Sequence, residues 1–220
     1  MTPPLRIAVL ASGRGSNLAA LIDARDAGSL PVEFTVVASD KADAGALRLA
    51  EASGIPTLSL SPRDYADRPS YDRELFARIA GSGAELLILA GFMRIIDGAV
   101  LAPWTGRIIN IHPSLLPRYR GLHTHRRALE AGDAEHGASV HFVTAELDGG
   151  PVIAQAKLAV LPGDDEHTLA LRLLPLEHQL LPAVTALIAG HRLALDTEGV
   201  TLDRQRLTCP LQLQNGVLAP

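Results

Sequence analysis

Short segments rich in apolar residues recur along the first half of the chain and predict the buried strands of a parallel sheet. They lie at residues 7–11, 36–40, 55–60, 85–91 and 107–112. Helical segments are predicted between them, at residues 18–24, 44–53 and 70–81. Ser70 is predicted to be the N-cap of the third segment, since serine side chains accept hydrogen bonds from the first turn of a helix. Strands that alternate with helices in this way indicate an α/β fold.

The second half of the chain predicts a short helix, two further strands and one long helix. These lie at residues 126–131, 138–147, 152–161 and 168–190. Asp148-Gly149 falls between the two strands, and an Asp-Gly pair is a common hairpin turn, so Asp148 taken alone is a turn residue. Pro175 and Pro182 predict a kink or a break in the long helix. Residues 191–220 are expected to form a short strand or a weakly structured tail.

Composition narrows the class of protein. The 220 residues suit one α/β domain or at most two small ones, and 47% are hydrophobic, enough for a real core. The formal charge is −4 and no dense basic run occurs, which argues against a nucleic-acid partner. Cys209 is the single cysteine, so a reducing compartment fits. Neither a signal peptide nor an apolar run of about 18 residues is present, so a soluble cytoplasmic protein without a membrane partner is expected.

Candidate chemistry begins at the strand of residues 107–112. Asn110 and His112 are two residues apart, so their side chains point to the same face of the strand, and Pro113 ends it. Ligands of open α/β sheets bind at the carboxyl ends of strands. An amide N–H and an imidazolium N–H could both point at one developing oxyanion. A polar pair that only anchors a loop is the alternative.

A glycine turn follows the first strand, with the sequence Ser-Gly-Arg-Gly-Ser-Asn at residues 12–17. Because it leads into a helix, it offers free backbone N–H groups and a positive dipole end to a phosphate, while a tight connection is the simpler alternative. A nucleotide-binding oxidoreductase is a rival of a different class. Leu18 replaces the third glycine of the dinucleotide fingerprint, yet Asp40 ends the second strand, where an acid can hold a ribose.

Two further features bear on ligand binding. The apolar segment at residues 92–96 follows a strand and packs either in the core or around a flat ring. Among the eight histidines, His123 and His125 are two apart, but no metal-binding spacing occurs, so no metal site is predicted. His141 lies on the strand that leads to Asp148 and is placed near the same cleft.

The eight residues from Asn110 to Pro117, Asn-Ile-His-Pro-Ser-Leu-Leu-Pro, resemble the signature of the folate-dependent formyltransferases. Further similar segments are residues 12–17, 89–96, 121–125, 135–137, 139–143 and 146–151. The resemblance covers residues 5 to about 205. It implies a Rossmann-like, mostly parallel sheet with an antiparallel C-terminal extension and helices on both faces. It also implies a single domain over residues 1–205, followed by a tail at residues 206–220.

The resemblance also implies roles for individual residues. Asn110, His112 and Asp148 match the catalytic residues of the family. The positions that match ribonucleotide-binding residues are Gly15, Ser16, Asn17 and Glu177. The positions that match folate-binding residues are Arg68, Met93, Arg94, Ile95, Ile96, Asn110, Ala145, Glu146 and Leu147. Leu174 and Pro175 depart from the family pattern just before Glu177, and Arg14 adds a cation inside the phosphate loop.

The implied reaction is transfer of the formyl group of 10-formyltetrahydrofolate, a co-substrate, to the amine of glycinamide ribonucleotide in purine biosynthesis. No metal is implied, and the protein is expected as a monomer or weak homodimer. Two rivals share the folate chemistry. A transferase that acts on methionyl-tRNA would carry a basic C-terminal domain, for which residues 191–220 are too few. A formyltetrahydrofolate hydrolase would carry an N-terminal regulatory domain, whereas the first strand is expected at residue 5.

Overall fold

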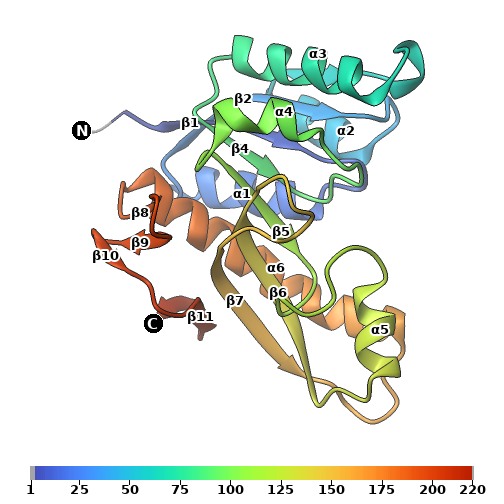
Figure 1. Ribbon diagram of the computed structural model, residues 1–220, viewed down its shortest axis with the longest axis vertical. Coiled ribbons are helices and arrows are strands. Elements are labelled where there is room, and N and C mark those ends of the chain that lie inside the picture. Colours follow the sequence, from blue (N-terminus) through green and yellow to red (C-terminus); the bar gives the residue numbers. More distant parts are fainter. Residues whose placement is uncertain (1–2, 220) are drawn as a thin grey trace. The chain divides into compact units, whose positions relative to one another are not determined.

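The computed structural model describes residues 3–219, and the chain forms two compact units that divide between Asn110 and Ile111 (Figure 1). Strands of the first unit are β1 Leu5–Leu10, β2 Val32–Ser39, β3 Thr57–Ser59, β4 Leu86–Leu89 and β5 Ile108–His112, whose last two residues belong to the second unit. They pair in the order β3-β2-β1-β4-β5, and every pairing is parallel.

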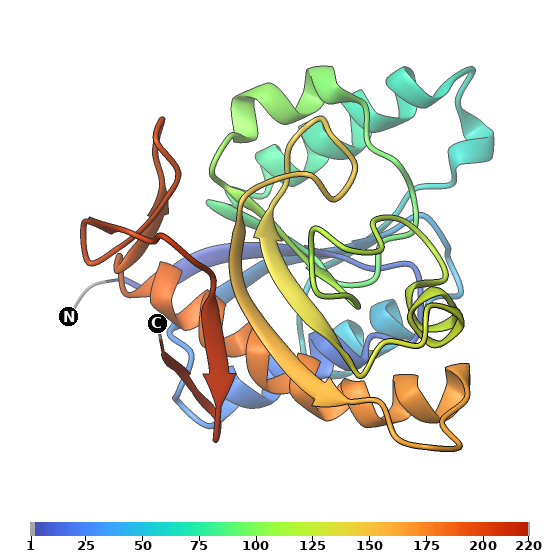
Figure 2. The same cartoon turned by 60° about the horizontal axis from the view of Figure 1, so that its bottom comes forward.

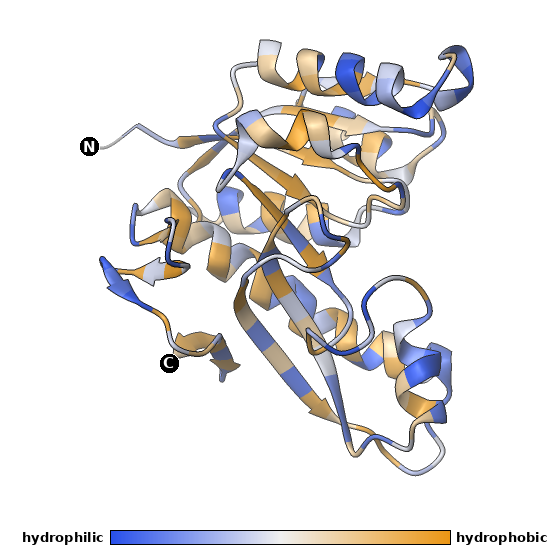
Figure 3. Ribbon diagram, in the orientation of Figure 1, coloured by the Kyte–Doolittle hydropathy of each residue, from blue (hydrophilic) through white to orange (hydrophobic). Residues whose placement is uncertain are grey.

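Helices cover these strands on two sides. They are α1 Ser16–Asp26, α2 Gly45–Ala52, α3 Arg68–Gly81 and α4 Gly98–Leu101, with the short 3-10 helices η1 Pro62–Asp64 and η2 Ala102–Trp104. Figure 1 shows α3 and α4 on one side of the strands and α1 on the other. The four residues from Ile7 to Leu10 have no exposed surface, which explains the unbroken apolar run in the sequence (Figure 3).

The second unit is built on antiparallel and mixed pairings. β6 Glu135–Phe142 runs antiparallel to β7 Val152–Ala159; β7 is parallel to β11 Leu211–Gln214, and β12 Val217–Ala219 returns antiparallel. A separate small antiparallel sheet holds β8 Leu193–Leu195, β9 Val200–Leu202 and β10 Gln205–Arg206. Helix α5 Thr124–Glu130 precedes β6, and α6 Glu166–Ala189 packs against β6 and β7 (Figure 2). The predicted α/β class, mostly parallel with antiparallel strands in the C-terminal half, is confirmed.

The predicted N-cap of the third helix was wrong, and so was a break in the long helix, whereas a kink in that helix stays a prediction. Asp67, not Ser70, caps α3: its Oδ1 accepts a hydrogen bond of 2.8 Å from the Ser70 N–H, so the helix begins at Arg68. Helix α6 is also unbroken, although Pro175 and Pro182 lie inside it. Its buried apolar face, which includes the fully buried Leu180, and a capping box at its start outweigh the two missing backbone hydrogen bonds.

The C-terminal residues are ordered into strands. β11 and β12 both lie within residues 206–219, where a tail was expected, and Leu211 is 1% exposed. A single domain over residues 1–205 stays a prediction. Within residues 3–219, no helix is both long enough and apolar enough to cross a membrane.

Candidate active site

The imidazole of His112 lies at the end of β5, buried, with a partner at each nitrogen. Its Nε2 is 3.0 Å from the backbone oxygen of Tyr119, and its Nδ1 is 3.5 Å from Oδ2 of Asp148. A carbonyl oxygen can only accept, so Nε2–H donates this hydrogen bond. The ring is therefore held between a neutral acceptor and a carboxylate.

Asp148 faces two imidazoles and one backbone donor. Its Oδ2 accepts a hydrogen bond of 2.9 Å from the Gly121 N–H, and its Oδ1 lies 3.6 Å from Nε2 of His141. Burial acts to raise the pKa of Asp148, but His141, His112 and the Gly121 N–H together hold it below its ordinary value. Although Asp148 does occupy a turn, with φ of 48°, its side chain is an ionised group set beside His112.

Two partners act to raise the pKa of His112: the carbonyl oxygen of Tyr119 and the carboxylate of Asp148. Burial is the largest cause, however, and it lowers the pKa of His112 below that of a free histidine because it penalises the charged ring. The protein without ligands therefore favours the neutral imidazole.

Asn110 belongs to the first unit and stands two residues before His112 in the same strand. It pairs with Leu89 of β4 and is partly exposed. Strand alternation gives it the same facing direction as His112. The amide is thus available at the carboxyl end of the parallel strands of the first unit.

The glycine turn is shaped by Gly15. This residue is the N-cap of α1 with φ of 86°, and no side chain caps the helix. A Cβ at Gly15 would lie 2.8 Å from Cα of Ala46, so the backbone passes too close to α2 for any larger residue. Asn17 is buried in the first turn of α1, whereas Arg14 is exposed beside it. No side chain caps the first turn of α1, and phosphate binding at this turn stays a prediction.

The apolar segment after β4 presents its side chains to solvent on an anchored backbone. Met93 is 66% and Ile95 is 56% exposed, so core packing is the wrong interpretation for these two residues. Ser12 Oγ accepts a hydrogen bond of 3.1 Å from the Met93 N–H, and the carboxylate of Asp72 accepts one of 2.7 Å from the N–H of residue 97. Such exposure on a fixed backbone suits a surface that binds a flat ring.

Arg94 is held differently from its apolar neighbours. Its guanidinium lies 5.0 Å from the ring centre of Tyr71, which is fully buried, so it stacks on the aromatic ring. Burial raises the pKa of the adjacent Asp72. Ile96 is half-buried in the same segment, and Arg68 is exposed in the first turn of α3.

The other positions implied by resemblance lie in the second unit. Ala145, Glu146 and Leu147 form an exposed loop before Asp148, and Glu146 is ion-paired with Arg120. Glu177 is 9% exposed within α6, and the departure from the family pattern at Pro175 leaves its helix intact. Sequence reasoning missed Tyr119 and Gly121, which act through backbone atoms and so leave no side-chain signal.

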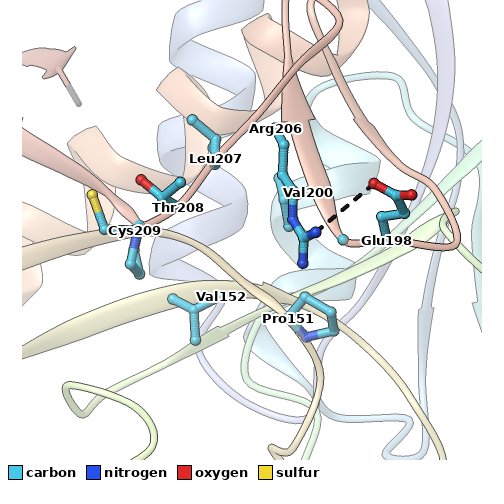
Figure 4. Close-up of a pocket in the computed structure, with 10 residues that line it drawn as sticks. Pro151, Val152, Glu198, Val200, Arg206, Leu207, Thr208 and Cys209 are labelled. Atoms are coloured by element: carbon cyan, nitrogen blue, oxygen red, sulfur yellow. Dashed lines mark ion pairs between the residues drawn. The ribbon is translucent and has the colours of Figure 1, made fainter.

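A surface pocket of about 370 Å³ lies elsewhere in the second unit (Figure 4). Its lining residues are Pro151, Val152, Glu198, Gly199, Val200, Arg206, Leu207, Thr208, Cys209 and Pro210. Arg206 and Glu198 face each other there at 3.8 Å. None of the residues predicted for catalysis or binding lines this pocket. In the part of the chain from residue 3 to 219, no group of three or more histidine, cysteine or acidic side chains is arranged to hold a metal.

The chain belongs to the formyl transferase family, whose sequence model matches residues 5–185. It is similar to the phosphoribosylglycinamide formyltransferase of Escherichia coli (strain K12), with 49% identity over 203 residues that cover 92% of this chain and 96% of the relative.

Two other similar proteins support the same family assignment. The trifunctional purine biosynthetic protein adenosine-3 of Drosophila pseudoobscura pseudoobscura is 47% identical over 86% of this chain, which corresponds to 14% of that longer protein. The solved structure of the phosphoribosylglycinamide formyltransferase from Coxiella burnetii, in complex with CHES, superposes with a TM-score of 0.89. The two chains are 44% identical, and the match spans 93% of this chain and 96% of the solved chain.

Proposed function

We propose that this protein transfers the formyl group of 10-formyltetrahydrofolate to the amine of glycinamide ribonucleotide, a step of de novo purine biosynthesis. The observation that carries this proposal is the 49% identity to a phosphoribosylglycinamide formyltransferase over 92% of the chain. The pairing of His112 with Asp148 supports it, because formyl transfer needs groups that stabilise a developing negative charge.

The chemistry follows from the charge that the reaction creates. The neutral amine attacks the formyl carbon, which turns the carbonyl oxygen into an oxyanion. Donors from the Asn110 amide and the His112 ring stabilise this oxygen, and one such donor is typically worth about 10²–10³ in rate. The free protein favours a neutral His112, and the negative charge of the oxyanion then favours the imidazolium. The attacking amine loses a proton and N10 of the folate gains one as its bond to the formyl carbon breaks, with a bound water as carrier.

Asp148 acts on this charge in two ways. Its carboxylate favours the imidazolium of His112 across 3.5 Å. Its hydrogen bond from the Gly121 N–H holds the carboxylate in place. Asp148 therefore offsets part of the free-energy cost that burial imposes on forming the imidazolium of His112.

The ribonucleotide is assigned to the glycine turn. Gly15, Ser16 and Asn17 form the start of α1, where backbone N–H groups and the helix dipole favour a phosphate. Arg14, exposed in the same turn, adds a positive charge. Glu177 is assigned to the amine end of the substrate, because a carboxylate suits an amino group.

The folate is assigned to the exposed segment after β4 and to the loop before Asp148. The pterin-binding residues are proposed to be Met93, Arg94, Ile95, Ile96, Asn110, Ala145, Glu146 and Leu147. Arg68, exposed at the start of α3, is proposed for the acidic tail of the folate, since a guanidinium binds carboxylates. No metal takes part. The protein is proposed to be cytoplasmic, as a monomer or weak homodimer, with these two small molecules as its partners.

The test mixes purified protein with 10-formyltetrahydrofolate and glycinamide ribonucleotide and follows the deformylated folate by absorbance. Deformylation that requires the ribonucleotide supports the proposal. Release of formate without the ribonucleotide would instead make the protein a hydrolase. Binding of NADH with no folate binding would favour an oxidoreductase.

A further inference from the structure

Tyr119 holds an uncommon backbone conformation at the point where it meets His112. Its φ is 54°, in the left-handed region that side chains other than glycine seldom adopt. Its backbone oxygen accepts the 3.0 Å hydrogen bond from Nε2–H of His112. Because a residue in this region needs support from its surroundings, the aim of this carbonyl depends on what holds Tyr119.

Three side chains hold Tyr119, and we call Asp133, Arg118 and Arg127 the Tyr119 clamp. Tyr119 O–H donates to Oδ2 of Asp133 at 2.7 Å, and Arg118 both donates to the Tyr119 hydroxyl at 3.1 Å and pairs with Asp133. The guanidinium groups of Arg118 and Arg127 lie 5.1 and 5.2 Å from the ring centre. The hydrogen bond to Asp133 raises the pKa of Tyr119 and lowers that of Asp133, as a charge-assisted bond does.

The neighbouring backbone is tied down as well. Arg127 Nη1 donates to the backbone oxygen of Arg120 at 2.6 Å, and Ser114 Oγ donates to the backbone oxygen of Arg118 at 2.7 Å. The residues on both sides of Tyr119 are therefore anchored by their own carbonyl oxygens. Within this anchored backbone, the Tyr119 carbonyl points toward Nε2 of His112.

The direction of that carbonyl decides which nitrogen of His112 reacts. A neutral imidazole carries one proton, and both neighbours of the ring, the Tyr119 oxygen and the Asp148 carboxylate, only accept. The Tyr119 oxygen is 3.0 Å from Nε2, closer than the carboxylate is to Nδ1, so this shorter contact keeps the proton on Nε2. Nδ1 then carries the lone pair, 3.5 Å from the Asp148 carboxylate. The proton that turns the ring into an imidazolium must add at Nδ1.

We propose that Tyr119, held by its clamp, is a positioning residue for His112: its carbonyl fixes the proton of the neutral ring on Nε2, so that the second proton, which makes the imidazolium, is taken up at Nδ1 beside Asp148. The consequence for formyl transfer rests on the proposed function, whereas the assignment of the ring protons does not. Groups other than the carbonyl also act on His112. They are the carboxylate of Asp148, the charge of Arg127 and the rings of His141, His125 and His136.

The test uses the full chain with Tyr119→Phe and Asp133→Asn. Tyr119→Phe keeps the ring beside the two arginines but removes the hydroxyl, and Asp133→Asn removes the charge. Asp203→Asn is the matched control, because Asp203 is also ion-paired with an arginine, Arg192, but has no tyrosine partner. The ¹⁵N NMR signals of the His112 ring report which nitrogen is protonated in protein without any substrate, and a His112→Asn sample assigns them.

The wild-type protein is expected to show His112 with its proton on Nε2 alone when neutral. Both clamp variants should show a mixture of the two protonated forms and titrate at a lower pH, because they weaken a bond that favours the imidazolium. Turnover should fall about 10- to 100-fold with KM nearly unchanged, and the alkaline limb of its pH profile should move to lower pH. Asp133→Glu, which keeps the carboxylate, should restore most of the turnover, and Asp203→Asn should match the wild type.

A wild-type His112 with its neutral proton on Nδ1, or clamp variants with wild-type signals and pH profile, would overturn the proposal. A variant that does not fold is replaced by Arg118→Lys, which keeps the charge and loses the planar fork. The two proposals fail separately. If the NMR result is as expected but the wild type transfers no formyl group, the proposed function is wrong and the positioning of His112 stands.

Discussion

At His112, burial and charge act in opposite directions on the same ring. Burial lowers its pKa, while the Tyr119 carbonyl and the Asp148 carboxylate raise it. Each pKa unit corresponds to about 1.36 kcal/mol, so losing either favourable partner makes the imidazolium measurably harder to form. The contribution of Asp148 can be tested directly, because a substitution removes its side-chain charge, whereas the carbonyl of Tyr119 belongs to the backbone.

Asp148→Asn should leave a folded protein with much weaker turnover. Asparagine keeps the side-chain shape and tolerates φ of 48°, but it removes the charge that raises the pKa of His112. The pKa of His112 falls further, and activity that needs the imidazolium, present below this pKa, is lost at lower pH. Turnover should drop about 10²-fold or more, with the alkaline limb displaced, as read from kcat across pH.

The control for this change is Asp203→Asn, at another turn aspartate with φ of 50°. It should fold, turn over and titrate like the wild type. If Asp148→Asn behaves in the same way, Asp148 is a turn residue only and His112 has no carboxylate partner in catalysis.

At the scale of elements, two connections that follow parallel strands carry most of the proposed binding. The turn between β1 and α1 is fixed by the close approach of Gly15 to Ala46. The segment after β4 is fixed near both ends, because the N–H groups of Met93 and Asp97 donate hydrogen bonds to the side chains of Ser12 and Asp72. Each rigid backbone exposes the groups that a ligand would contact, N–H groups in the first and apolar side chains in the second.

Gly15→Ala should raise KM for the ribonucleotide about 10-fold or more and leave KM for the folate nearly unchanged. The new Cβ would lie 2.8 Å from the Ala46 backbone, so the turn must shift away from the phosphate. Gly28→Ala is the control, because Gly28 has a similar φ of 74° but open space around it. Steady-state kinetics in each substrate separate the two variants. Unchanged KM values in folded Gly15→Ala would argue against phosphate binding at this turn.

Ile95→Glu should weaken folate binding about 10-fold or more and affect ribonucleotide binding little. The residue is 56% exposed, so the fold tolerates the change, while a charge now stands where an apolar ring should bind. Titration calorimetry with each ligand measures this. Leu161→Glu, at a leucine that is 49% exposed outside the segment, is the matched control. Equal weakening of both ligands would contradict the assignment.

At the scale of the whole molecule, apolar burial determines the secondary structure where local propensity and tertiary packing favour different outcomes. Helix α6 contains two prolines and yet runs from Glu166 to Ala189 without a break. Its leucines Leu173, Leu180 and Leu181 have no exposed surface, and it packs on β6 and β7. The stability of this helix should therefore depend on its buried side chains more than on its own backbone hydrogen bonds.

Leu180→Ala should lower the free energy of unfolding by about 2–5 kcal/mol, since a fully buried leucine leaves a cavity. Leu171→Ala, in the same helix at a leucine that is 49% exposed, should cost much less. Urea denaturation measures both. Equal losses would mean that helix propensity, and not packing, holds α6 together.

The sequence alone determined the features that depend on near neighbours. Apolar runs located the buried strands, alternation placed Asn110 and His112 on one face, and the glycine turn located the start of α1. The family motifs singled out Asp148, which an Asp-Gly pattern by itself assigns to a turn. These inferences succeed because strand and helix periods, turn chemistry and motif spacing are local properties.

Only the tertiary structure decided the environment of the reacting ring. The Asp148 carboxylate, the Tyr119 carbonyl and the Gly121 N–H reach His112 or its partner from positions that no local pattern connects. The pKa of His112 is lowered because burial, the largest cause, depends on every segment packed around the ring. Backbone groups also carry no residue-specific signal in a sequence. Desolvation and long-range contacts are properties of the packed chain, and for that reason they remained out of reach until the fold was known.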